Sequence, residues 1–148
     1  MPQSLSQVYV HLIFSTKHAE ALIDNSIDSR LCAYMVGTLA ELRSYTDAIY
    51  ANPDHLHILC TLPRILSIAS MVSKVKSASS KWMKENGVPN FFWQDGYGIF
   101  SVSASKVEAV KKYILNQAIH HQKVSYKDEL REFFKQYNIK YDEAYVWD

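Results

Sequence analysis

The chain contains few of the residues that interrupt regular structure, with only 4 glycines and 4 prolines among 148 residues. This scarcity argues against a disordered segment or a repeat array. No apolar run approaches the roughly 20 residues that a membrane-spanning helix needs, so we expect no membrane span. The N-terminal residues show no basic segment followed by an apolar one, so we also expect no signal peptide.

The chain also contains few cysteines and carries a small net charge. Cys32 and Cys60 lie in apolar stretches without a CxxC spacing. This placement predicts reduced core residues of a cytoplasmic protein rather than a disulfide or a zinc site. The formal net charge is only +1, so any surface for nucleic acid must be local. A length of 148 residues with 48% hydrophobic residues predicts a single domain, 1–148, with a proper core.

The hydrophobic pattern predicts alternating strands and helices. Strands are expected at 8–15, 45–51, 55–62 and 99–103, and helices at 27–43, 68–84, 105–123 and 126–137. The order is β-α-β-β-α-β followed by two helices. This order predicts an α+β fold of the ferredoxin-like (split β-α-β) type, a four-stranded antiparallel sheet with additional C-terminal helices. Two helices would cover one face of the sheet and leave the other for a site or a further helix.

Two pairs of residues suggest a chemistry. His55 and His57 are two apart on a predicted strand, so both side chains point to the same side. Tyr113 and Gln117 are four apart on a predicted helix and share one face. The first pair is typical of a divalent-metal site, and the second of a nucleophile with a further metal ligand one turn away. If the first strand neighbours the histidine strand, His11 lies on the same face, beneath the helix of Tyr113. With no serine or cysteine constellation, the pattern suggests phosphodiester transfer through a phosphotyrosine.

The same residues lie in segments that resemble a known family. Asp54-His55-Leu56-His57 resembles the HUH motif (His, bulky hydrophobic, His) of HUH-superfamily single-strand DNA nucleases. Tyr113-x-x-x-Gln117 resembles the nucleophile helix of the single-tyrosine transposases, found in small insertion sequences and as REP-associated tyrosine transposases. Three further segments match in the family's order: FSTK (14–17), WQDGYG (93–98) and QAIHH (117–121). The combination is more specific than the short HxH motif alone.

This resemblance implies an enzyme that cuts single-stranded DNA beside an imperfect hairpin. The hydroxyl of Tyr113 would attack the scissile phosphate, form a 5′-phosphotyrosine link and release a 3′-OH that later rejoins strands. Mg²⁺ or Mn²⁺ held by His55, His57 and Gln117 would polarise the phosphate. Imidazole suits Mn²⁺ better than Mg²⁺, so the identity of the metal stays open. The resemblance also implies a homodimer with composite active sites, in which the Tyr113 helix of each chain completes the other chain's histidine site.

Further candidates concern DNA contacts and accessory groups. A nearly neutral protein that binds DNA must concentrate its cations, so we predict phosphate contacts for some of Lys17, Lys74, Lys76 and Lys81. The alternative for these lysines is a solvated helix face. Trp93 and Tyr97 are candidate base-stacking residues, with core packing as an equal alternative. Candidate accessory residues are His11, His120 and His121, and none of them stands out as a general base.

Two other functions are left open by the sequence. The same chemistry could serve a domesticated single-strand nickase or a replication initiator. Initiators tend to carry a lysine where this chain has Gln117, which disfavours that branch. A non-catalytic nucleic-acid-binding module on the same fold is the second alternative, and covalent capture of labelled single-stranded DNA separates it from the enzyme.

Overall fold

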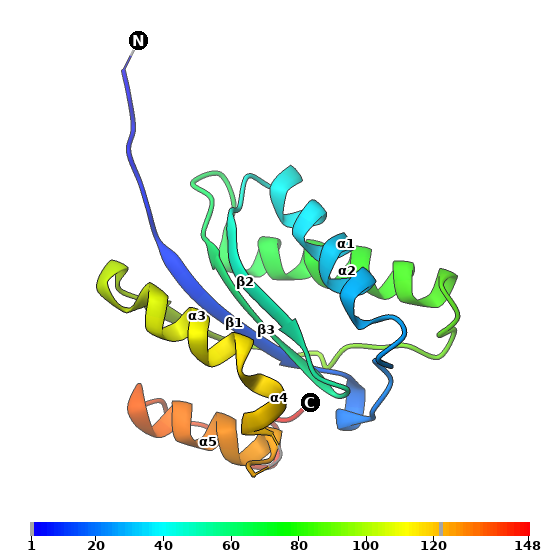
Figure 1. Cartoon of the computed structure of the whole chain (residues 1–148). Helices are drawn as coiled ribbons and strands as arrows, with labels where there is room; N and C mark the ends of the chain where they lie inside the picture. The colour runs from blue at the N-terminus through cyan, green and yellow to red at the C-terminus, as the bar shows by residue number, and fades with distance from the viewer. Residues whose placement is uncertain (1, 122) are drawn as a thin grey trace.

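A computed structural model describes residues 2–121 and 123–148 of the chain (Figure 1). The strands are β1 (Tyr9–Ser15), β2 (Thr46–Ala51), β3 (His55–Thr61) and β4 (Gly98–Val102). The helices are α1 (Asp28–Glu41), α2 (Ile68–Glu85), α3 (Val107–Leu115), α4 (Gln117–His120) and α5 (Tyr126–Gln136), with short 3-10 turns η1 (Lys17–Ala19) and η2 (Ala104–Lys106). Within the described residues, no helix combines the length and apolar character that crossing a bilayer requires.

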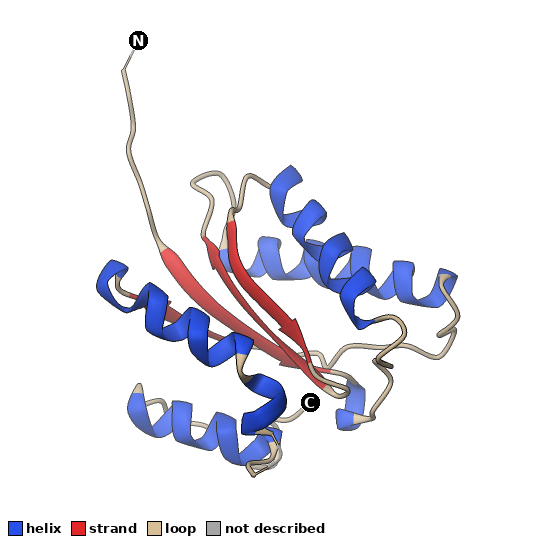
Figure 2. Ribbon diagram, viewed as in Figure 1, coloured by secondary structure: helices blue, strands red, loops and turns tan. Residues whose placement is uncertain are grey.

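The four strands form one sheet in the order β2-β3-β1-β4, and every neighbouring pair is antiparallel (Figure 2). The two central strands are aligned so that Ile13 lies opposite His57 and Ser15 lies opposite His55. The α+β class and the ferredoxin-like order predicted from the sequence are confirmed. The register also places the first strand beside the histidine strand.

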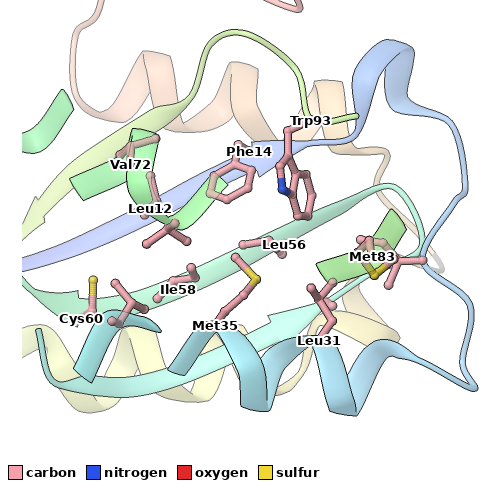
Figure 3. Close-up of a cluster of buried hydrophobic side chains, with 14 of the residues drawn as sticks. Leu12, Phe14, Leu31, Met35, Leu56, Ile58, Cys60, Val72, Met83 and Trp93 are labelled. Carbon is pink, nitrogen blue, oxygen red and sulfur yellow. The ribbon is translucent and has the colours of Figure 1, made fainter. Parts of the chain in front are cut away.

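The main core lies between the sheet and helices α1 and α2 (Figures 1 and 3). Leu12 and Phe14 of β1, Leu56 and Ile58 of β3, and Met35 of α1 are all fully buried there. Each of these side chains contributes roughly 1.5–3 kcal/mol when it is removed from water. This half of the molecule therefore supplies much of the stability, and the opposite face of the sheet can carry polar residues.

Helices α3, α4 and α5 cover that opposite face (Figure 1). The helix α5 begins at a capped end, because the Ser125 side chain accepts a hydrogen bond from the backbone N–H of Asp128. Its apolar residues Leu130 and Phe134 pack with Ile13 of β1 in a second, smaller cluster. The histidine face of the sheet is thus enclosed by helices of the same chain.

The helix predicted at 105–123 is not continuous, which corrects the sequence analysis. A 3-10 turn precedes it, and the helix is interrupted at Asn116 between α3 and α4. At Asn116 φ is −99° and ψ is 16°, and its N–H is shared by the carbonyls of Lys112 and Tyr113. Asparagine is unfavourable inside a helix because its side chain competes for backbone hydrogen bonds, which favours an interruption here. The last helical residue is His120, and residue 122 of the predicted range lies outside the described residues.

Candidate active site

Strand β3 presents His55 and His57 on the face away from α1 and α2. Their side chains are almost completely buried, at 1% and 0% exposure. The rings lie 5.3 Å apart, centre to centre. The strand alternation that buries Leu56 and Ile58 in the main core is therefore the same alternation that sets both imidazoles on the opposite face.

Two residues from the C-terminal part of the chain, His121 after α4 and Glu129 on α5, complete a cluster around this pair. Oε1 of Glu129 on α5 lies 3.0 Å from Nε2 of His57 and 3.1 Å from Nε2 of His121. Nε2 of His121 is also 3.1 Å from Nε2 of His55. One ligand atom from each of these four side chains lies within 4.8 Å of the others. Three imidazole nitrogens and one carboxylate oxygen are a donor set that suits a divalent transition metal.

Tyr113 reaches the same cluster from α3. Its hydroxyl donates a hydrogen bond to Oε2 of Glu129 and lies 3.3 Å from Nε2 of His120. Gln117 is fully buried, and its Nε2 donates to Oε2 of Glu129 over 3.2 Å. The Oε1 of Gln117 accepts from Nδ2 of Asn52, also over 3.2 Å. The fold therefore places Tyr113 and Gln117 close to the two strand histidines. Both residues are linked to the histidines through hydrogen bonds to Glu129.

Hydrogen bonds on the far side of the rings orient the strand histidines. Oδ1 of Asp54 lies 2.6 Å from Nδ1 of His55, so this carboxylate turns Nε2 of the ring toward the cluster. Nε2 of His11 lies 2.8 Å from Nδ1 of His57 and orients that ring in the same way. His11 was predicted to share the histidine face, and its position confirms this.

Burial and hydrogen bonds fix the charges of the cluster. Burial acts to raise the pKa of Glu129, but hydrogen bonds from three histidines outweigh it and hold that pKa well below its usual range. Burial lowers the pKa of His57 to about 4, so the ring is neutral at pH 7, which is the form that a metal ligand takes. Burial, together with the bond to Glu129, raises the pKa of Tyr113. The cluster therefore holds a carboxylate, a neutral imidazole at His57 and a protonated phenol.

Glu129 was missed by the sequence analysis, and His121 was treated only as an accessory residue. The signal for His121 was its spacing, because Tyr113, Gln117 and His121 are each four residues apart and would share one face of the predicted helix. The signal for Glu129 was its place on an apolar stripe, one residue before Leu130, where a carboxylate is unusual. Neither sequence pattern indicates which other helix or strand the side chain contacts.

The predicted stacking residues and one predicted lysine lie away from the cluster. Trp93 is only 6% exposed, and its Nε1–H donates to Oγ of Ser79 over 2.9 Å, so it occupies the core position that was its alternative. Tyr97 is 39% exposed. The ammonium of Lys76 donates to the backbone carbonyls of residues 94–96 and lies 5.7 Å from the centre of the Tyr97 ring. Burial lowers the pKa of Lys76 to about 8. Lys76 therefore links the WQDGYG segment to α2 through hydrogen bonds.

The other predicted lysines are not gathered around Tyr113. Lys17 forms an ion pair with Asp95 at 3.3 Å. Lys74 and Lys81 are exposed on α2, which covers the face of the sheet opposite to Tyr113. Phosphate contact by these lysines stays a prediction, and it would require a DNA path that extends around the sheet edge.

The sequence profile described as "Transposase IS200 like" matches residues 4–117. The chain belongs to the IS200-like transposase family. The resemblance to single-tyrosine transposases is thereby confirmed, and membership supports a transposase function and thus a DNA-cleaving enzyme. The matched segment contains the strand histidines, Tyr113 and Gln117, whereas His121 and Glu129 lie beyond it.

Solved structures show the same transposase fold. A Deinococcus radiodurans protein assigned as a transposase is 20% identical with a TM-score of 0.63, covering 79% of this chain and 98% of that one. A REP-associated tyrosine transposase bound to a REP hairpin is 15% identical with a TM-score of 0.61, covering 84% of this chain and 74% of that one. At these identities the likeness shows the fold alone. No curated protein matches the chain.

Proposed function

We propose that this family member is a metal-dependent transposase that cleaves and rejoins single-stranded DNA next to hairpins, through a 5′-phosphotyrosine link at Tyr113. The observation that supports this is the convergence on Glu129. The hydroxyl of Tyr113 and the imidazole of His57 bond to the two oxygens of that one buried carboxylate. A nucleophile and a metal-binding group therefore lie side by side, as phosphoryl transfer requires.

The proposed metal ligands are His55, His57, His121 and Glu129. The fit rests on the donor set and on Asp54, which holds one ring in the orientation that a ligand needs. When bound, a divalent cation would polarise a phosphate oxygen and offset the negative charge that grows there. Three imidazoles with one carboxylate suit Mn²⁺ or another transition metal better than Mg²⁺.

Gln117 stays a proposed ligand as well, as the sequence pattern suggested. Its amide contacts the cluster through Glu129 and is fixed on its other side by Asn52. A neutral amide oxygen is a weaker ligand than a carboxylate, so Glu129 takes the stronger role in this proposal. Gln117 then also positions that carboxylate.

In the cleavage step, the phenolic oxygen of Tyr113 would form a bond to phosphorus while the bond from phosphorus to the 3′-oxygen breaks. The phenol loses its proton, and the departing 3′-oxygen gains one. The polar groups that contact the hydroxyl are Glu129 and His120, so they orient it for attack. Rejoining runs the same bond changes in reverse, with a 3′-OH as the nucleophile, which explains why no external energy source is needed.

The proposed DNA partner is a single-stranded hairpin, which agrees with the hairpin-bound relative of similar fold. A homodimer with composite sites stays part of the proposal. In the described fold Tyr113 contacts His57 and His120 of its own chain, so a composite dimer would exchange equivalent contacts between two chains. A nickase or a replication initiator would use the same residues and differs in the DNA that it processes.

The test of the proposed function is the substitution Tyr113→Phe. We expect it to abolish covalent capture of labelled single-stranded hairpin DNA on a denaturing gel, because only the hydroxyl is removed. Hairpin binding in a mobility-shift assay should stay within a few-fold of the wild type. A wild-type protein that binds the hairpin and never forms an adduct would be a binding module. An undiminished adduct on Tyr113→Phe would show that the nucleophile is another residue.

A further inference from the structure

A groove beside Tyr113 is left unused by the cleavage chemistry. It encloses about 830 Å³ and is lined by residues of α3, of α5 and of the edge strand β4. One end of the groove is formed by Tyr113, His120 and Glu129. Its volume is in the range of sites that hold small molecules, about 300–1,000 Å³. A group attached to the phosphate under attack would therefore be in reach of the groove.

The walls of the groove are largely apolar and aromatic. Val110 lines it from α3, Phe133 lines it from α5, and Tyr137 lines it directly after the end of α5. Both aromatic rings stack on Phe100, with ring centres 5.4 Å and 4.8 Å away. Phe133 also meets the ring of Tyr113 edge to face at 5.9 Å. These rings are held in place by their neighbours and form a fixed surface against which a flat, unsaturated group can pack.

The charged side chains along the groove include an acceptor that a base can use. Away from Tyr113, the charged side chains that line it are Lys106, Asp128 and Glu132. Asp128 lies 2.9 Å from Arg131, whereas Glu132 is exposed and forms no ion pair within residues 2–121 and 123–148. A carboxylate repels phosphate, but it accepts hydrogen bonds from the amino groups of nucleobases. An aromatic wall with a free carboxylate at its rim therefore matches the chemistry of a base.

We propose that this groove binds one unstacked, amino-bearing nucleobase of the DNA strand, next to the phosphate that Tyr113 attacks. This inference rests on the proposed cleavage at Tyr113. The base packs against Phe133 and Tyr137, and its amino group donates to Glu132. Adenine, cytosine and guanine carry an exocyclic amino group, whereas thymine carries only carbonyl oxygens at the corresponding positions. The groove thus disfavours thymine beside the cleavage site.

The first test sequences the products that the protein makes from a fully randomised single-stranded DNA library. Both the strand attached to Tyr113 and the released strand are read. We expect thymine to be depleted about tenfold at one position within two nucleotides of the linked phosphate. Glu132→Gln should lose this depletion. The control Glu108→Gln, which removes an exposed carboxylate of α3 outside the groove lining, should keep it. Wild-type products without a bias, or an equal bias in Glu132→Gln, would overturn the proposal.

A second measurement does not depend on cleavage. The Tyr113→Phe protein is irradiated with single-stranded oligonucleotides that carry 8-azidoadenine, and the modified peptides are identified by mass spectrometry. Cross-links at Phe133 or Tyr137 support the base site, and cross-links confined to other elements overturn it. Groove cross-links together with a wild-type protein that forms no adduct would refute the cleavage chemistry and retain the base site. Failure of the proposed base site and failure of the proposed cleavage chemistry therefore give different results.

Discussion

Replacing Glu129 with glutamine should weaken metal binding while preserving the shape of the site. The change removes the anionic ligand that accompanies the three imidazoles of the cluster. A ligand present at 100 times its dissociation constant stabilises a protein by about 2.7 kcal/mol. For a chain of this size, 1 kcal/mol corresponds to about 2–4 °C in Tm. We therefore expect the Tm of the wild type to rise by roughly 5–11 °C when Mn²⁺ is added at that level.

The variant should lose about half of this rise or more. Removing even an outer partner of a metal ligand costs about 10- to 100-fold in affinity, so losing a charged ligand should cost at least as much. At the same Mn²⁺ concentration, Glu129→Gln would then gain about 0.4–1.4 kcal/mol, or roughly 1–6 °C. The assay is a pair of thermal melts for each protein, in EDTA and in MnCl₂. Only the difference between the two melts is compared, so the hydrogen bonds that the variant loses cancel.

Glu132→Gln is the matched control, because it removes an exposed carboxylate three residues further along the same helix. It should retain the full metal-dependent rise. An equal rise in Glu129→Gln and the wild type would refute the role of Glu129 as a ligand. A wild type whose Tm does not respond to Mn²⁺, Mg²⁺ or Zn²⁺ would refute the metal site itself.

Three further outcomes are expected. His55→Ala and His57→Ala should each abolish cleavage as chelation does, since each removes an imidazole of the cluster; cleavage at full rate in excess EDTA would exclude a catalytic metal. Iodoacetamide at neutral pH should leave cleavage unchanged, because burial raises the pKa of Cys32 and Cys60 to about 11 and both stay unreactive thiols; loss of cleavage in a folded, alkylated protein would contradict this. If the predicted dimer has composite sites, mixing the Tyr113→Phe and His57→Ala proteins should restore adduct formation, with the DNA attached to the His57→Ala chain. Mass spectrometry confirms that subunits have exchanged. If exchange occurs and no adduct forms, each chain uses its own histidines.

The parts of the site that could be predicted from the sequence are those with a local period. Alternation along β3 separates His55 and His57 from the core residues between and beside them, and a four-residue spacing joins Tyr113 to Gln117. The same periodicity gave the strands, the helices and their order. Each of these inferences needs only neighbours in sequence.

The remaining parts depend on contacts between distant elements. Glu129 occupies a position on α5 that ordinary amphipathic patterning would assign to an apolar residue, and only the packing of α5 over the sheet shows what it meets. The interruption at Asn116 likewise depends on how the chain turns from α3 toward α5. Trp93 and Lys76 were candidates for DNA contact by residue type, but tertiary packing assigns both to internal contacts.

The position of Glu129 also matters for anyone who trims or fuses this protein. The family segment ends at Gln117, which makes that residue an obvious boundary for a minimal catalytic fragment. A fragment cut there would keep the two strand histidines and the tyrosine but would lose Glu129. It would also lose the helix that packs on Ile13 of the sheet. The smallest autonomous unit of this enzyme therefore extends through α5, and a fused partner belongs beyond that helix.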